Sequence, residues 1–165
     1  MRIRRLRRGV RADSLHQVPL FAACGGKELQ RIARLTTEIH VEAGRVLTLV
    51  DRPGAEFFII ASGMATVWRG DVQLDSLGPG SFFGELSLFD RDVRTATVVA
   101  DTDMRLLVLS RAEFFSSHFL VPTVMERMLA EISRRLRRAD HGWAANWADR
   151  QELSGSRDLS SQALS

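Results

Sequence analysis

The feature that most limits the fold is a long stretch in which short apolar segments alternate with glycine turns. It runs from Glu38 to Leu109, and Gly44, Gly54 and Gly63 mark corners within it. Several short strands separated by turn residues at regular spacing are typical of an antiparallel sandwich or barrel. The expected strands are Val46–Val50, Phe57–Ala61, Ala65–Arg69, Val72–Leu77, Thr95–Val99 and Arg105–Leu109.

Helical patterns lie on both sides of this stretch. Residues Lys27–Thr36 form an approximate apolar face, which predicts a short helix. Ser110 and Glu113 have the spacing of a capping box, so a second helix is expected to run to about Phe119. Pro122 suits the first position of a longer helix, where its missing N–H would have no partner. Apolar residues recur there at helical spacing: Val121, Val124, Met125, Met128, Leu129, Ile132 and Leu136.

Length and composition describe one ordinary globular domain. The chain has 165 residues, of which 45% are hydrophobic and 26% are charged. No apolar run has the length of a membrane-spanning helix, and no secretory signal follows the arginine-rich N-terminus. Cys24 is the only cysteine, so no internal disulfide can form. This favours a reducing, cytoplasmic setting, with Cys24 as a small core residue and not a nucleophile.

The positive charge of the chain is concentrated at its N-terminus. Residues 1–11 contain six arginines and no acid, whereas the remaining residues carry 17 basic and 20 acidic side chains. We expect residues 1–14 to form a basic N-terminal arm that is disordered or loosely helical. Such an arm can be a solvated tail, or it can bind nucleic acid or an anionic membrane. Residues 142–165 are expected to be a polar, disordered tail.

The segment Gly78–Phe89, followed by Arg94–Thr97, is the part of the sequence that indicates chemistry. Gly84 is expected to open a short helix, where backbone N–H groups lack internal partners and carry partial positive charge. Glycine also lets an anion approach the backbone closely. Arg94 can hold two phosphate oxygens at once, and Thr95 adds a hydroxyl donor. These groups predict a site for a singly charged phosphate.

Glu85 lies inside this predicted site although a carboxylate repels phosphate. One reason for an acid there is that a carboxylate accepts strongly from a ribose 2′-hydroxyl. A phosphate and a 2′-hydroxyl held close together are the features of a 3′,5′-cyclic nucleotide, whose ring constrains both. The segment therefore indicates a cyclic nucleotide as ligand, and a plain salt bridge between Glu85 and Arg94 is the alternative interpretation.

The same residues resemble the phosphate-binding cassette of the cyclic-nucleotide-binding domain superfamily. Its members include catabolite activator protein, kinase regulatory subunits and cyclic-nucleotide-gated channels. The shared pattern is F-G-E-L-x-L, a short loop, and then R-[AST]-A. The chain has Phe83-Gly84-Glu85-Leu86-Ser87-Leu88 and then Arg94-Thr95-Ala96, with matching glycines at Gly44, Gly63, Gly78 and Gly80.

This resemblance covers about Pro19 to Asp140 and implies a fold. It implies an α+β, mainly β architecture: an antiparallel β-roll, or jelly-roll-like barrel. A short N-terminal helix, a short cassette helix and two C-terminal helices would accompany the roll. The domain is expected to occupy residues 15–141.

The resemblance also implies roles for individual residues. Gly84 and Leu86 would offer backbone amides, Glu85 would accept from the ribose hydroxyl, and Arg94 and Thr95 would hold the cyclic phosphate. The helix that begins at Pro122 would lie over the base as a lid and would form the seam of a homodimer over 122–140. The complete implied ligand-binding set is Phe83, Gly84, Glu85, Leu86, Ser87, Arg94, Thr95 and Ala96.

Two positions depart from the family at the end that reads the base. Catabolite activator protein has a Thr-Ser pair there, whereas this chain has Ala139 and Asp140. An aspartate could accept hydrogen bonds from guanine, which would favour cGMP, or Asp140 could simply be solvated. We expect either cAMP or cGMP as ligand, with cAMP slightly favoured.

Only 25 residues follow Asp140, too few for the helix-turn-helix domain of bacterial relatives. We therefore expect a stand-alone regulatory sensor, acting on an unknown downstream protein and lacking a DNA-binding domain. The alternatives are a nucleic-acid-binding regulator that uses the Arg-rich arm and a degenerate module that binds no nucleotide.

Catalysis is not expected. No nucleophile, base and orienting group occur together in the sequence. A metal-dependent barrel enzyme needs clustered ligands, whereas the four histidines are scattered. Neither a metal nor another cofactor is therefore expected besides the nucleotide ligand. The histidines are His16, His40, His118 and His141.

Overall fold

A computed structural model of the chain describes residues 4–89, 93–116 and 119–139. The chain divides into two units, Met1–Met128 and Leu129–Ser165, which are treated separately below. The predicted tail over 142–165 and the base-reading candidate Asp140 lie outside the described residues. The domain boundaries proposed from the sequence stay predictions.

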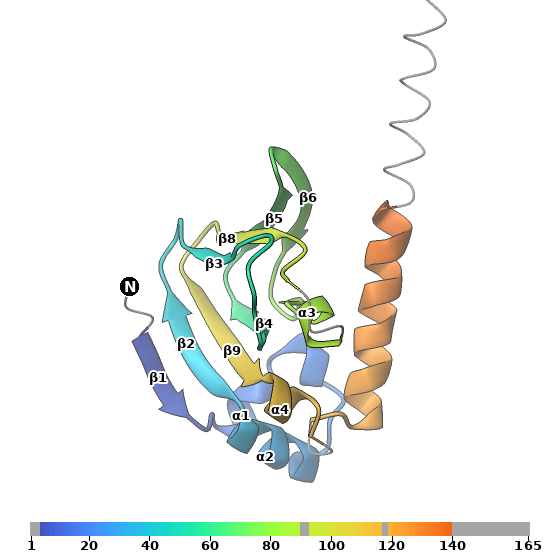
Figure 1. The fold of residues 1–165 in the computed structure, drawn as a ribbon. Coiled ribbons are helices and arrows are strands. Elements are labelled where there is room, and N and C mark those ends of the chain that lie inside the picture. The colour runs from blue at the N-terminus through green and yellow to red at the C-terminus, as the bar shows by residue number, and fades with distance from the viewer. Residues whose placement is uncertain (1–3, 90–92, 117–118, 140–165) are drawn as a thin grey trace, which may run out of the picture. The chain divides into compact units, whose positions relative to one another are not determined.

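The first unit is built on two antiparallel sheets, which confirms the predicted β-roll (Figure 1). The sheets remain separate layers of a roll and do not close into a barrel. One sheet contains, in spatial order, β1 (Arg4–Arg8), β2 (Thr37–Val41), β9 (Met104–Ser110), β4 (Glu56–Ser62) and β7 (Phe82–Phe83). The other contains β3 (Val46–Thr48), β8 (Thr97–Ala100), β5 (Ala65–Arg69) and β6 (Val72–Leu77).

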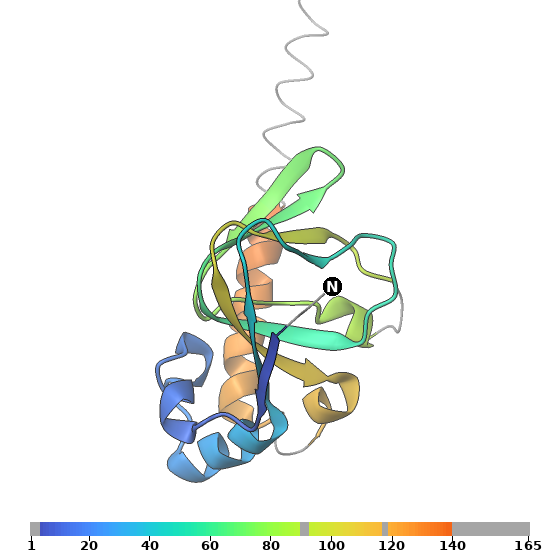
Figure 2. The ribbon, with the colours of Figure 1, turned by 90° about the vertical axis from the view of Figure 1, so that its left-hand side faces the viewer.

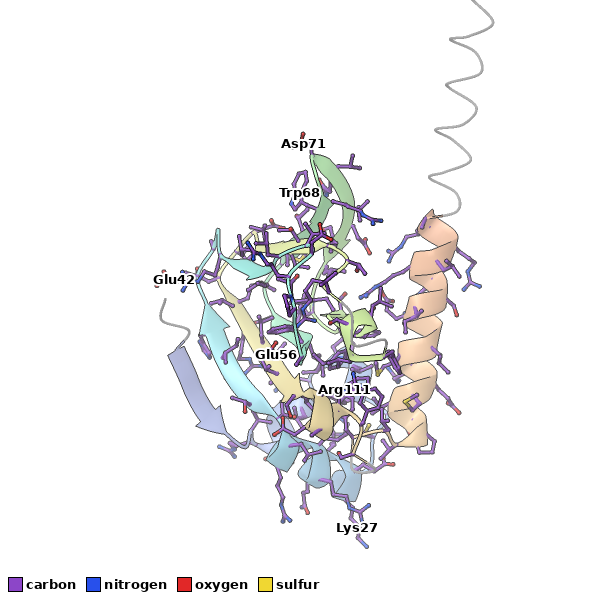
Figure 3. All side chains as sticks on the ribbon, viewed as in Figure 1. Lys27, Glu42, Glu56, Trp68, Asp71 and Arg111 are labelled. Atoms are coloured by element: carbon purple, nitrogen blue, oxygen red, sulfur yellow. The ribbon has the colours of Figure 1, made fainter. Side chains whose placement is uncertain are left out.

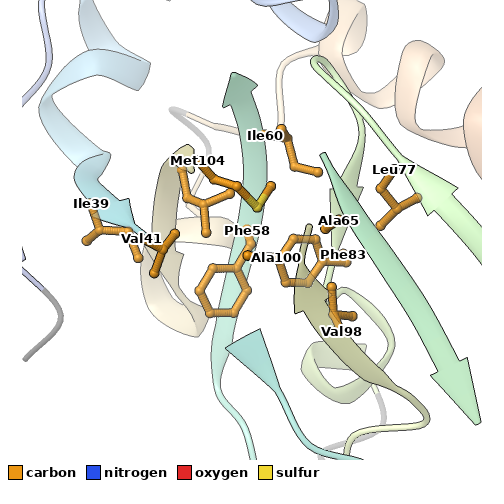
Figure 4. Packing of buried hydrophobic residues seen from close by; sticks show 11 residues of the cluster. Ile39, Val41, Phe58, Ile60, Ala65, Leu77, Phe83, Val98, Ala100 and Met104 are labelled. Atoms are coloured by element: carbon orange, nitrogen blue, oxygen red, sulfur yellow. The ribbon is translucent and has the colours of Figure 1, made fainter. Parts of the chain in front are cut away.

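The side chains of β4 point alternately to its two faces and pack on both of them. Phe58 and Ile60 point into the space between the sheets, where they join a buried apolar cluster contributed by both of them (Figure 4). Phe57 and Ile59 are equally buried but face the other way, since successive strand residues point to opposite faces. Both faces of this strand are therefore apolar, which accounts for its unbroken hydrophobic run.

Helices α1, α2 and α4 lie at one end of the first unit, and the β5–β6 hairpin projects from the opposite end (Figures 1 and 2). Phe57 reaches this helical end, where its ring centroid lies 4.7 Å from that of Phe114 and 5.8 Å from that of Phe119. The helical elements are α1 (Ala12–Leu15), a 3₁₀ turn (Pro19–Phe21), α2 (Gly26–Leu35), α3 (Leu86–Phe89), α4 (Arg111–Phe114) and a helix over 122–139.

The capping box at the start of α4 is confirmed, but the helix is shorter than predicted. Glu113 N–H donates to Ser110 Oγ, and Ser110 N–H donates to a carboxylate oxygen of Glu113. The helix ends at Phe114 instead of about Phe119. Phe114 and Phe119 both pack into the same aromatic group, with ring centroids 5.4 Å apart. Five residues of continuous helix would turn their side chains about 140° apart, so the chain must leave the helix between them.

The expectation of an arm without fixed structure is wrong for Arg4–Arg8, which form strand β1. The strand pairs with β2, and its register places Arg4 opposite His40 and Arg7 opposite Glu38. Backbone groups at the edge of β2 gain partners in this way. Gly9, with a φ of 85°, then ends the strand and donates its N–H to Thr36 O at 3.1 Å.

Within the described residues, no helix combines the length and apolar character needed to span a membrane.

Candidate functional site

Arg94 is a buried cation at the entrance of β8. Its backbone is fixed on both sides by the loop before β4: Arg94 N–H donates to Arg52 O, and Asp51 N–H donates to Arg94 O, both at 2.9 Å. Only 6% of its side chain is exposed. An arginine so deeply buried requires acceptors for its N–H groups.

Four acceptors surround the two terminal nitrogens of Arg94. Nη1 donates to Gly84 O at 2.9 Å and to Ser87 Oγ at 2.8 Å. Nη2 donates to the backbone oxygen of Glu56 at 2.9 Å and to its Oε2 at 3.3 Å. The guanidinium therefore joins the start of β4 to the segment that leads into α3.

Two glycines leave room for this guanidinium. A Cβ on Gly54 would overlap Nε and Cζ of Arg94. A Cβ on Gly84 would lie 2.5 Å from Nη1 and 2.8 Å from Glu56 O, and Gly84 has a φ of 86°. A side chain at either position would therefore displace the arginine or the backbone around it.

The predicted cassette helix is present as the four residues of α3. Glu85 and Ser87 are buried at its start, while Leu86 is exposed. Ser87 Oγ donates to Gly84 O at 3.2 Å, so one carbonyl oxygen is shared by Ser87 and Arg94. This geometry brings Gly84, Ser87 and Arg94 together.

Aromatic rings form the floor beside Arg94. Phe83 of β7 stacks on Phe58 of β4, with centroids 4.9 Å apart and planes 10° apart. The Cζ atom of Arg94 lies 5.8 Å from the centroid of the Phe58 ring, within the range of a cation–π contact. Phe83 thus packs against the same ring that Arg94 contacts.

Burial lowers the pKa of Arg94 from its ordinary value, while the carboxylates of Glu56 and Glu85 act in the opposite direction. An arginine in such surroundings remains charged near neutral pH. The site therefore combines one buried cation with two carboxylates that interact with it.

The remaining predicted site residues that the structure describes are less buried than Arg94. Thr95 is exposed, and Ala96 is half-buried with its carbonyl oxygen accepting from Thr48 Oγ1 at 3.2 Å. Ala139 is exposed on the helix of the second unit. The base-reading roles of Ala139 and Asp140 stay predictions.

The sequence analysis does not identify Glu56, and it identifies Gly54 only as a turn. Both residues contact Arg94 from about 40 positions earlier in the chain, and their contact depends on how the roll closes. The sequence signal that could have identified these two residues is local. It is a glycine two positions before an acid, at the point where a buried strand begins.

Other features of the described residues do not compete with this site. No group of three or more histidine, cysteine or acidic side chains could hold a metal ion there. A hollow lined by polar side chains, among them His40, Arg45 and Arg105, lies at the opposite end of β4, beside Ser62. It contains none of the cassette residues.

The chain is similar to proteins that carry a cyclic nucleotide-binding domain, and the family model of that domain matches residues 38–117. A cAMP-dependent protein kinase regulatory subunit of Aspergillus fumigatus is 33% identical over 129 residues, which cover 77% of this chain and 29% of that protein. Glutaminase 2 of Bradyrhizobium diazoefficiens is 34% identical over 131 residues, which cover 75% of this chain and 21% of that protein.

A solved structure gives the same assignment. The catabolite activator protein of Thermus thermophilus superposes with a TM-score of 0.64 at 31% identity, covering 74% of this chain and 60% of that one. The chain spans less than a third of the length of the two curated relatives above, so the likeness concerns the domain and not those whole proteins. The matched residues include Gly84 and Arg94. By family model and fold, residues 38–117 of the chain are a cyclic nucleotide-binding domain.

Proposed function

We propose that the chain binds a 3′,5′-cyclic nucleotide as a regulatory sensor and does not act as an enzyme. The observation that carries the proposal is the buried guanidinium of Arg94, held between Gly84 and Glu56 beside the start of α3. A buried cation next to the backbone amides at the start of a helix suits a phosphate diester. A sensor releases its ligand unchanged and needs no nucleophile.

The cyclic phosphate would contact Arg94, the hydroxyl of Thr95 and the amides of Gly84 and Leu86. The ribose 2′-hydroxyl would donate to Glu85, which is 7% exposed and therefore positioned by its surroundings. The proposal is tested by isothermal calorimetry with cAMP and cGMP. Binding of either one supports it, and the absence of binding by both overturns it.

We propose cAMP as the slightly preferred base and cGMP as the alternative. The specific reason to keep cGMP is Asp140, whose carboxylate would meet two donors on guanine but only one amine on adenine. Competition binding with wild type and Asp140→Ala distinguishes the two. A tenfold cAMP preference that the substitution leaves unchanged removes the cGMP alternative.

A homodimer through the helix over 122–139 is part of the proposal. Leu129 and Leu136 are 57% and 63% exposed, and Ile132 lies at matching helical spacing between them. Ile132→Glu should shift the protein toward monomer in light scattering, with Ser133→Glu on the same turn as the control. A monomeric wild type, with and without nucleotide, contradicts the dimer.

Strand β1 favours a second candidate function, nucleotide-responsive binding of nucleic acid. Four of its five residues are arginine, and it lies at one edge of its sheet. Affinity for DNA or RNA should then fall steeply with salt and change with nucleotide. Binding to anionic vesicles in place of nucleic acid would assign the arginines to a membrane surface. Either role is compatible with the cytoplasmic setting that we propose.

A further inference from the structure

We propose that Glu56 is a charge filter: its carboxylate occupies Arg94 when no ligand is bound, and it lets the site accept a phosphate with one negative charge while disfavouring one with two. This inference rests on the proposed function, because it concerns how the same site chooses among nucleotides. It assigns a specificity role to a residue outside the cassette.

The four acceptors of Arg94 are not equally replaceable. Gly84 O and the backbone oxygen of Glu56 are fixed by the chain, and Ser87 Oγ belongs to a buried side chain. The Oε2 atom of Glu56 is the exception: its hydrogen bond is the longest of the four at 3.3 Å, and the side chain is 55% exposed. An incoming phosphate oxygen would therefore replace this carboxylate first.

The displaced carboxylate cannot move far from the site. The backbone oxygen of Glu56 still accepts from the same Nη2 of Arg94. In addition, Oε2 accepts from the backbone N–H of Ala55 at 3.2 Å, a bond that does not depend on Arg94. Glu56, whose position is labelled in Figure 3, would thus remain as a negative charge beside the bound phosphate.

The balance of charge at the site then favours a monoanion. Exchange of the Glu56 carboxylate for a diester phosphate replaces one singly charged acceptor of Arg94 Nη2 with another. A monoester phosphate brings a second charge at neutral pH, since its second pKa is about 6. This extra charge meets the carboxylate of Glu56, which remains beside Arg94, and adds repulsion that a diester phosphate would not meet.

Such a filter would help a cyclic-nucleotide sensor to distinguish its ligand from the hydrolysis product of that ligand. Water opens the cyclic diester by breaking one P–O bond, and the resulting 5′-monophosphate keeps the same base, ribose and phosphorus. The two molecules differ in ring closure and in charge. A sensor that reads both properties rejects the opened form more strongly than one that reads shape alone.

The test uses three probes on the full chain. They are cAMP, 5′-AMP and adenosine 5′-methylphosphate, which is linear like AMP but carries one charge like cAMP. Dissociation constants are measured by calorimetry for wild type, Glu56→Gln and the control Glu42→Gln. Glu42 is an exposed acid in the turn after β2, near the far end of β4 (Figure 3).

Glu56→Gln should tighten the binding of 5′-AMP by about tenfold, equivalent to about 1.4 kcal/mol. It should change binding of cAMP and of the methyl ester by less than about threefold, because an exposed carboxylate contributes little to a balanced exchange. Glu42→Gln should change none of the three. Wild type alone should bind the bulkier methyl ester more tightly than AMP, a result that needs no variant.

An unchanged ratio of cAMP to AMP affinity in Glu56→Gln would overturn the filter while leaving the proposed function intact. If the ratio is unchanged because all three probes lose affinity equally, Glu56 is a positioning residue for Arg94. If wild type binds neither cAMP nor cGMP, the proposed function itself fails and takes the filter with it.

Discussion

The region around Arg94 and the helical segment around Glu131 use the same two residue types in opposite ways. At the first, one arginine gathers acceptors from three residues, two of them backbone oxygens. At the second, one glutamate gathers arginines: Arg134 at 2.7 Å, Arg135 at 3.1 Å and Arg138 at 3.7 Å.

The difference lies in how far apart the partners are in the chain. Glu131 reaches residues three, four and seven positions later on one helix, so these contacts report only that the helix is formed. Arg94 joins segments separated by up to 38 positions and is almost fully buried. A charged residue therefore helps to fix the tertiary fold when its partners are distant in sequence and include backbone groups. When its partners lie on the same helix, it stabilises that helix alone.

The largest effect is expected for Arg94→Ala. It removes the guanidinium that donates to Gly84 O, Ser87 Oγ and Glu56 O, and it should lower the free energy of unfolding by about 2 to 4 kcal/mol, since each hydrogen bond to a charged group is worth about 1.5–3 kcal/mol. Affinity for cyclic nucleotide should fall by at least about 1.5–3 kcal/mol, the scale of a charged hydrogen bond. Urea unfolding and calorimetry measure the two quantities.

Arg94→Lys is the control for charge, because it keeps the cation but loses the planar fork. It should recover part of the stability and little of the affinity. Wild-type affinity in Arg94→Ala would remove the site assignment altogether.

The next effect is expected for Gly54→Ala, which leaves Arg94 itself unchanged. The new methyl group would overlap the guanidinium, so cyclic-nucleotide affinity should fall by about tenfold or more while the arginine remains present. Gly26→Ala is the matched control, because no atom lies within 4 Å of the added Cβ and the residue is in α2. Equal affinities of the two variants would mean that Arg94 does not need its observed position.

A smaller and more selective effect is expected for Glu85→Ala. It removes the proposed acceptor of the ribose 2′-hydroxyl, so affinity for cAMP should fall by about 1.5 kcal/mol, the scale of one hydrogen bond to a charged group. Affinity for 2′-deoxy-cAMP should hardly change. Parallel losses for the two nucleotides would assign Glu85 a structural role instead.

The smallest effect is expected for Glu131→Gln in the helix over 122–139. Burial raises the pKa of Glu131, but hydrogen bonds and charges from Arg134 and Arg135 together outweigh it and leave the pKa below its ordinary value. Its contribution to stability is therefore present at neutral pH and is lost as the pH falls through the lowered pKa. The loss at pH 7 should be about 0.5–1 kcal/mol, two or three helix pairs.

Thermal unfolding followed by circular dichroism tests this comparison at pH 7 and in acid. The difference between wild type and Glu131→Gln should disappear in acid. A difference that persists at low pH would show that the variant acts through packing and not through charge.

The sequence predicted the roll because its glycine turns and short apolar runs are local signals. Strands β5 and β6 have the predicted bounds, and the capping box at Ser110 is where its spacing placed it. Local signals fail where long-range pairing decides. The pentapeptide Arg-Arg-Leu-Arg-Arg occurs twice, as strand β1 and at 134–138 in a helix.

Context separates these two copies. The helical copy follows Glu131, which pairs with three of its arginines, and it continues a long apolar-striped helix. The strand copy is followed by Gly9 and lies against β2, which is 29 or more positions later in the chain. No window around residues 4–8 contains that information, so a sequence-based expectation of disorder was the natural error.

The residues of the candidate site also fall into two groups: those that a local pattern predicts and those that long-range pairing positions. Gly84 and Arg94 are ten positions apart and belong to one recognisable pattern, so their meeting could be predicted. Glu56 and Gly54 reach Arg94 only because β4 runs beside β7 and the loop before β4 returns to residue 94. Register and closure of the roll place them, and neither can be derived from spacing along the chain.

The two glycines around Arg94 also change how other sequences of this kind should be compared. Arginine is common and can be retained by chance, whereas the space beside Gly54 is filled by the guanidinium itself. A related chain that keeps the arginine but carries a side chain at either glycine should have lost the ligand. The reverse pattern, glycines without arginine, would mark a more recent loss. Positions with no side chain are thus the more informative record of whether this kind of site is still in use.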